Sequence, residues 1–329
     1  MKKSFYKLPL LLVLFYWIFD IVFVITYSLG VDEYFFISSD MTTYKISREL
    51  IERILLNFIL QLPSLPVLFI TSVLLLNKYA INQINRKNIV NSLFIAILIT
   101  LGDSVVRLYY YTYIDGWIRL GRQYLNFHLN MFLFLPRYIT NFLGVAIVSF
   151  FIILLTYLGI KLLNKSYTHN DNALTQKESQ QLHLGLFIAL YNCYFLTAFL
   201  TLIEIDTNYS FRIIIDIAGL TIIFLLIANF LGYFLLRRCF KGVTKTIALK
   251  KLVFSSIGIF ILNCLLSSKL GMFSVSLVRY LEYWYEISEL EIIIIYFMTV
   301  VTLFILSSLL VRMAVKLIFG NMDKNHQSI

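Results

Sequence analysis

Long apolar segments recur along the whole chain, and each has about the length of a membrane-spanning helix. The first, Leu8–Leu29, contains a single charged residue, Asp20. A helix needs about 20 predominantly apolar residues to cross the hydrocarbon core of a bilayer. The pattern therefore predicts an all-α, polytopic integral membrane bundle of about eight transmembrane helices, at Leu8–Leu29, Ile54–Leu76, Ile89–Tyr111, Tyr138–Leu163, Leu184–Ile205, Ile213–Leu236, Leu252–Leu270 and Ile292–Val315.

The composition supports this interpretation, because the chain is too apolar for a soluble fold. Of its 329 residues, 60% are hydrophobic and 14% are charged, whereas a soluble domain has about 45–50% and about 25%. We therefore expect residues 1–329 to form a single transmembrane domain. The polar stretch 164–183 would be a cytoplasmic linker between two halves, 1–163 and 184–316, and the tail 317–329 would be disordered.

The basic residues predict which loops face the cytoplasm. Most of the 28 Lys and Arg residues lie at the two termini and in the loops after the second, fourth and sixth segments. Because cytoplasmic loops carry an excess of Lys and Arg, this pattern predicts an N-in/C-in topology in the plasma (inner) membrane. The net charge of +10 then reflects the placement of loops, and we expect no binding of nucleic acid.

Signatures of enzymes and cofactors are absent from the sequence. The three cysteines form no CxxC pair, and the four histidines lack the spacing of metal ligands. There is no HExxH, no GxSxG and no glycine-rich phosphate loop. We therefore expect no metal and no cofactor, and the sequence favours a function other than catalysis.

Asp20 is the first candidate functional residue, because it lies near the middle of its segment. A carboxylate at that depth costs at least about 2.5–3.5 kcal/mol on insertion scales, and such residues commonly serve in ion or proton pathways. One interpretation is a proton relay or cation site that faces the interior of the bundle. The other is a structural carboxylate, either paired with Arg107 or Arg137 or kept protonated by burial.

Further acidic residues stand at helical spacing or close together near the outer face. Asp103 and Arg107 are four residues apart, so they share one helix face. They form either a self-satisfied ion pair or part of the lining of a polar cavity. Asp216 lies at the outer start of the sixth segment, and with Glu204 and Asp206 it would either bind a cation or be solvated.

The second segment combines Gln61 with Pro63 and Pro66. Two prolines within a span predict a kink, whose freed carbonyl groups other helices must satisfy. A broken, polar helix near the bilayer midplane is typical of a transport site. A purely structural kink is the alternative.

Transport is the function that these features favour. The candidate pathway residues for the substrate or a coupling ion are Asp20, Gln61, Asp103, Arg107 and Asp216. The expected partners are the lipid bilayer and a small-molecule or lipid substrate, which the protein would transport or export. The sequence indicates neither the identity of the substrate nor the oligomeric state.

Two other functions stay open at this stage. The first is a membrane-embedded enzyme that acts on a lipid-linked substrate at the outer face. Its candidate residues are Arg119, Arg122 and Arg137, which would hold a phosphate, together with Glu204 and Asp206. The second is a non-catalytic assembly or immunity factor, which would need no motif at all.

Overall fold

The computed structural model describes the chain over several separate ranges. The described residues are 4–30, 50–51, 54, 64–81, 83–110, 113, 116, 135–169, 175, 178–179, 181–187, 189–191, 234, 249–285 and 287–319. Every regular element among them is a helix, and none is a strand. The all-α prediction is therefore confirmed for this part of the chain.

Five of the described helices are long and apolar enough to cross a membrane, which indicates an integral membrane protein. They cover Phe5–Tyr27, Arg86–Tyr109, Leu143–Ser166, Leu252–Tyr285 and Ile294–Ala314. These helices correspond to the first, third, fourth, seventh and eighth predicted segments. Shorter apolar helices at Ser64–Lys78 and Gln181–Tyr191 overlap the second and fifth predicted segments. The sixth lies almost entirely outside the described residues, so the number of eight spans stays a prediction.

The described helices belong to two compact units, which we consider separately. Unit 1 contains α1 (Ser4–Gly30), α4 (Ser64–Lys78), most of α5 (Arg86–Tyr109) and the second half of α7 (Leu135–Leu163). In this unit α1 packs against α4, where the rings of Tyr6 and Phe69 stack with centroids 6.2 Å apart.

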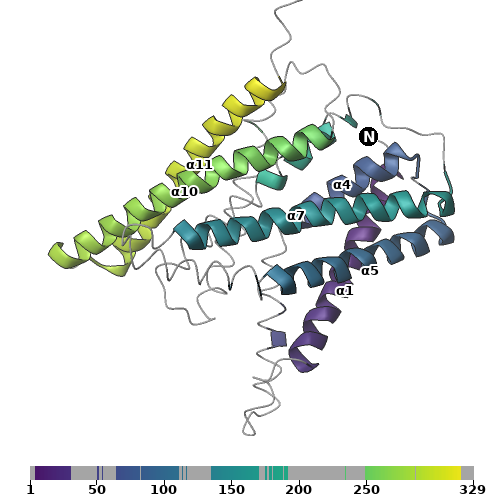
Figure 1. Cartoon of the computed structure of the whole chain (residues 1–329), viewed down its shortest axis with the longest axis horizontal. Coiled ribbons are helices and arrows are strands. Elements are labelled where there is room, and N and C mark those ends of the chain that lie inside the picture. The colour runs from purple at the N-terminus through teal and green to yellow at the C-terminus, as the bar shows by residue number, and fades with distance from the viewer. Residues whose placement is uncertain are drawn as a thin grey trace, which may run out of the picture. The chain divides into compact units, whose positions relative to one another are not determined.

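Helices α5 and α7 run side by side in opposite directions (Figure 1). Gly159 of α7 faces Ile95 of α5, and Gly102 of α5 faces Leu155 of α7. Because glycine has no side chain, each of these positions allows the neighbouring helix to approach closely. Each helix thus contributes one glycine, and the two glycines allow α5 and α7 to pack closely at both places.

The described part of the second segment is α4, which covers Ser64–Lys78 and contains Pro66 near its beginning. Pro63 and Gln61 lie outside the described residues, so the predicted kink stays a prediction.

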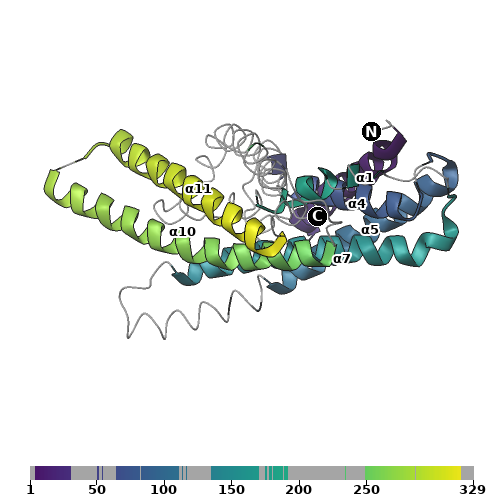
Figure 2. The same cartoon turned by 90° about the horizontal axis from the view of Figure 1, so that it is seen from above.

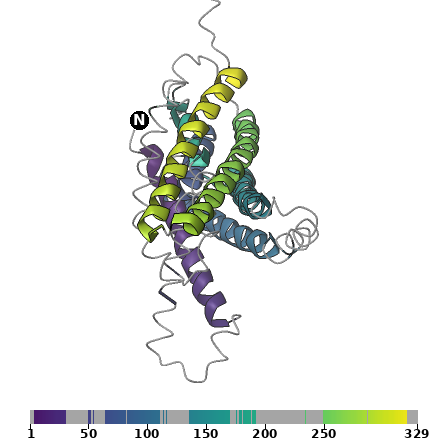
Figure 3. The ribbon, with the colours of Figure 1, turned by 90° about the vertical axis from the view of Figure 1, so that its left-hand side faces the viewer.

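Unit 2 contains a long helical hairpin of α10 (Leu249–Tyr285) and α11 (Glu289–Phe319), visible in Figures 2 and 3. Inside the hairpin, the hydroxyl of Ser307 donates a hydrogen bond of 2.7 Å to Oδ1 of Asn263. At the turn, the carboxylate of Glu291 accepts bonds from the N–H and the hydroxyl of Ser288, at 2.7 and 2.8 Å. This capping box defines the start of α11.

Helix α10 is longer than its predicted span. The prediction ended the segment at Leu270, next to Lys269, but the helix continues to Tyr285 without interruption. Residues 271–285 contain no proline, and Val275 and Val278 remain buried in this part. At 1.5 Å per residue, 37 residues span about 55 Å. The helix is therefore longer than a bilayer is thick, about 40–45 Å with its headgroups.

Candidate functional site

Helix α5 directs polar side chains toward the interior of unit 1 and apolar side chains outward. Its buried polar residues are Asn88, Asn91, Ser92, Thr100, Asp103 and Ser104. Between Asn88 and Ser104 its exposed residues are all apolar, namely Val90, Phe94, Leu98 and Leu101, and Val105 and Leu108 are exposed just after this stretch. A helix in contact with lipid shows this arrangement when its polar groups face a protein interior or a water-filled cavity.

The buried face of α5 has two polar groups with an apolar layer between them. We call Asn88, Asn91 and Ser92 the Asn group, and Thr100, Asp103 and Ser104 the Asp103 group. Ile95, Ala96 and Ile99 separate them, and each is at most 1% exposed. From Ser92 to Thr100 the axial distance is about 12 Å at 1.5 Å per residue.

Asp103 is bonded to another helix. The hydroxyl of Tyr16, on α1, donates a hydrogen bond of 2.9 Å to Oδ2 of Asp103. The Asp103 side chain is 1% exposed and Tyr16 is fully buried. Arg107, with which the sequence predicted either an ion pair or a shared polar cavity, lies one turn further along α5 and is half-buried, and this pairing stays a prediction.

Asp20 lies on the same face of α1 as Tyr16, one turn further along. Leu8, Leu12, Tyr16 and Asp20 are all buried, and their spacing of four residues forms one continuous stripe. Because Tyr16 contacts Asp103, this stripe faces the interior that α5 lines. The structure therefore brings two predicted pathway residues, Asp20 and Asp103, into the interior of unit 1. The spacing of Tyr16 and Asp20 was the sequence signal for this arrangement.

Helix α4 contributes two buried hydroxyl groups that have no hydrogen-bond partner among the described residues. They belong to Thr71 and Ser72, which are both fully buried. Other buried threonines of unit 1 behave differently, because Thr100 and Thr156 donate to the carbonyl oxygen one turn earlier, at 2.9 and 2.6 Å. A buried polar atom without a partner is destabilising by about 1–3 kcal/mol. The two α4 hydroxyls are thus available to a polar ligand.

The Asn group binds the segment that follows α7. Asn88 donates from Nδ2 to the carbonyl oxygen of Thr168 at 3.2 Å, and its Oδ1 accepts from the Thr168 N–H at 2.8 Å. Asn91 donates to the carbonyl oxygen of Ser166 at 2.9 Å. The hydroxyls of Ser92 and Tyr167 lie 3.5 Å apart. Sequence reasoning missed these contacts, although the i, i+3 spacing of the two asparagines placed them on one face.

Several predicted site residues lie outside the part that the structure describes. They are Gln61, Arg119, Arg122, Glu204, Asp206 and Asp216. Arg137 lies near the start of α7, but its side chain is also outside the described set. The cation site and the phosphate site predicted for the outer face therefore stay predictions.

Comparisons with known proteins show no similarity to this chain. No family model, no curated protein and no solved structure matches it. A function therefore has to be inferred from the chain's own residues.

Proposed function

We propose that this membrane protein is a transporter or exporter of a small polar or amphiphilic solute, with the interior of unit 1 as its route. The observation that carries the proposal is the inverted pattern of α5. Its polar residues are buried from Asn88 to Ser104, while all of its exposed residues over that stretch are apolar. Polar groups inside a membrane are energetically expensive, and they are commonly kept where an ion, a proton or a solute has to pass.

The two buried carboxylates could couple the transport of the solute to the movement of protons. Asp20 and Asp103 lie on α1 and α5 and are 5% and 1% exposed. A carboxylate that changes protonation inside a bundle can tie the movement of a proton to that of a solute. The hydrogen bond from Tyr16 joins Asp103 to α1, so a proton or solute that binds at Asp103 would alter a contact between α1 and α5.

The apolar layer would keep the proposed route closed in the conformation described here. Ile95, Ala96 and Ile99 fill the buried face of α5 between the two polar groups. Constrictions of this kind can block ions and water by dewetting. Movement of α1 or α4 against α5 would then open the layer, and the hydroxyls of Thr71 and Ser72 would meet the solute there.

The topology that we propose has eight spans in the plasma membrane, with both termini in the cytoplasm. The Arg86 end of α5 is then cytoplasmic. This orientation is supported by exposed basic residues that gather at the same end of unit 1, namely Lys78, Arg86, Lys87, Lys161 and Lys165. The Asp103 group then lies toward the outer side.

Uptake into proteoliposomes tests the proposal even though the solute is unidentified. Purified protein is reconstituted, a proton gradient is imposed, and a mixture of polar metabolites is added outside. Mass spectrometry of the vesicle contents then identifies compounds enriched above protein-free vesicles. We expect enrichment with the wild type and its loss in Asp20→Asn and Asp103→Asn, while Glu282→Gln, an exposed residue near the end of α10, serves as the control. Equal enrichment in all variants, or none in the wild type, would contradict the proposal.

A further inference from the structure

We propose that residues 164–169, which we call the strap, close the cytoplasmic end of the unit 1 interior, and that their release opens it. The strap follows α7 directly and begins with a short 3-10 turn, Asn164–Ser166. The inference rests on the proposed function, since a gate needs a route to close. It adds a named moving part to that function.

Every member of the Asn group contacts the strap. Asn88 forms a reciprocal pair with the backbone of Thr168, Asn91 binds the carbonyl oxygen of Ser166, and Ser92 meets the hydroxyl of Tyr167. These side chains begin the polar stripe of α5. Because the strap occupies all three, it covers the mouth of the route at this end.

Tyr167 is the part of the strap that fills the interior. Its side chain is 3% exposed, whereas its neighbours Ser166, Thr168 and His169 are half-buried or exposed. Burial raises the pKa of its phenol to about 12, and the contact with Ser92 lowers it only in part. The phenol therefore stays uncharged at cellular pH, as suits a side chain buried beside Ser92 of the Asn group.

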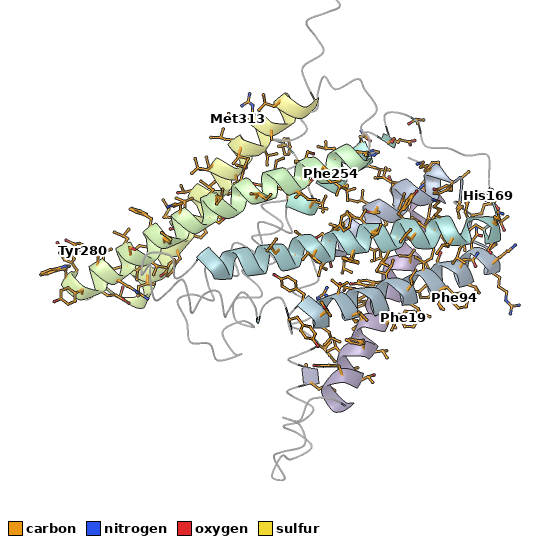
Figure 4. All side chains as sticks on the ribbon, in the orientation of Figure 1. Phe19, Phe94, His169, Phe254, Tyr280 and Met313 are labelled. Carbon is orange, nitrogen blue, oxygen red and sulfur yellow. The ribbon has the colours of Figure 1, made fainter. Side chains whose placement is uncertain are left out.

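His169 fastens the end of the strap to two helices. Its Nδ1 lies 2.8 Å from the carbonyl oxygen of Tyr79, just after α4, and its Nε2 lies 3.1 Å from that of Asn164, just after α7. The carbonyl ends of two helices thus meet at one ring, which Figure 4 labels at the end of α7. A neutral imidazole donates one of these bonds and the imidazolium donates both.

Basic residues lie close in sequence to the groups that this ring contacts and at the start of α5. They are Lys78 beside Tyr79, Arg86 and Lys87 at the start of α5, and Lys161 and Lys165 beside the strap, all exposed. The end of the strap therefore lies at the basic, solvent-exposed end of unit 1, where His169 is itself exposed.

The contacts suit a gate because opening leaves no polar group stranded. The Asn group bonds to the strap through side chains, so the backbone hydrogen bonds of α5 do not change when the strap leaves. The freed amide and hydroxyl groups would then line a hydrated mouth, where water replaces the strap atoms at little net cost.

Thiol accessibility in membrane vesicles tests the strap. In full-length protein with Cys193, Cys239 and Cys264 replaced by Ser, Thr100→Cys places a reporter beyond the apolar layer. A membrane-impermeant cationic methanethiosulfonate is added to inside-out or right-side-out vesicles, and the rate of modification is measured. Phe94→Cys, on the outward face of α5 and 57% exposed, is the control reporter, since a thiol in lipid stays protonated and unreactive.

The strap is loosened by Tyr167→Ala, which removes the plug, and separately by Asn88→Ala, which removes the reciprocal pair. We expect each to raise the rate at Thr100→Cys from the cytoplasmic side about tenfold, as the loss of one net hydrogen bond predicts. Neither should change the rate from the outer side or at Phe94→Cys. Tyr109→Ala, a substitution at an exposed tyrosine of the same helix (61% exposed), should leave every rate unchanged.

The outcomes distinguish a failure of the proposed strap from a failure of the proposed route. Equal cytoplasmic rates at Thr100→Cys in the wild type and both loosened variants would overturn the strap and leave the route standing. No modification from either side in any background would overturn the route, and the strap with it. A rise at Phe94→Cys as large as at Thr100→Cys would show general loosening of the bundle and would also overturn the strap.

Discussion

Replacing Tyr16 with Phe tests whether one hydrogen bond holds α1 against α5 at the candidate site. The hydroxyl of Tyr16 lies 2.9 Å from Oδ2 of Asp103, and the two side chains are 0% and 1% exposed. Phenylalanine keeps the ring, so the change removes a donor and leaves no cavity.

The expected magnitude follows from two kinds of measurement on other proteins. A hydrogen bond to a charged group contributes about 1.5–3 kcal/mol in soluble proteins. Bonds between membrane helices contribute about 0.6 kcal/mol on average and at most about 1.7 kcal/mol, because the reference state in lipid also finds partners. For this fully buried pair we expect a loss of about 1–2 kcal/mol in the free energy of unfolding.

Thermal unfolding of the detergent-solubilised protein measures this loss. For domains of 150–250 residues, 1 kcal/mol corresponds to about 2–4 °C in Tm. A double-mutant cycle with Asp103→Asn isolates the coupling between the two side chains. Tyr280→Phe, at a tyrosine that is 57% exposed on α10, is the matched control. A Tyr16→Phe protein as stable as the control, with no coupling in the cycle, would refute the reasoning.

Three further predictions concern stability and pH. Thr71→Val should raise Tm by removing an unpartnered buried hydroxyl yet lower uptake, whereas Thr156→Val, whose hydroxyl is bonded, should change uptake little; unchanged uptake in Thr71→Val would exclude a contact with solute. Gly159→Leu should destabilise by about 1–3 kcal/mol, since even a Cβ there would lie 3.1 Å from the facing isoleucine of α5, and an unchanged Tm would contradict that packing. Bonds from Ser288 lower the pKa of Glu291, so the first turn of α11 should be stabilised above the ordinary glutamate pKa and lose this stabilisation as the pH falls through the lowered value. Hydrogen exchange of that turn, corrected for intrinsic rates, should show no such pH dependence in Glu291→Gln.

The sequence was sufficient to predict the helices but not their partners. Each long helix follows from segment length and apolarity, which are local properties. Asp103 shows what the sequence alone could not predict. Its spacing from Arg107 is visible in the sequence, whereas the bond from Tyr16 joins residues 87 positions apart. Such a contact depends on how α1 crosses α5, which no local pattern determines.

The end of one helix was predicted less well. The predicted seventh span ended at Leu270, but a helix can continue beyond the bilayer, as α10 does to Tyr285. Hydropathy reports where lipid ends and does not report where backbone hydrogen bonding ends.

A cysteine scan along α5 tests the central claim, that its buried polar face lines a route across the membrane. Cysteines at Ser92, Thr100 and Ser104 sample the buried face, and cysteines at Phe94 and Leu101 sample the exposed apolar face. With impermeant thiol reagents added to either side of membrane vesicles, we predict modification at the three buried-face positions and none at the two lipid-facing ones. Modification of the two lipid-facing positions alone, or of no position from either side, would contradict the claim.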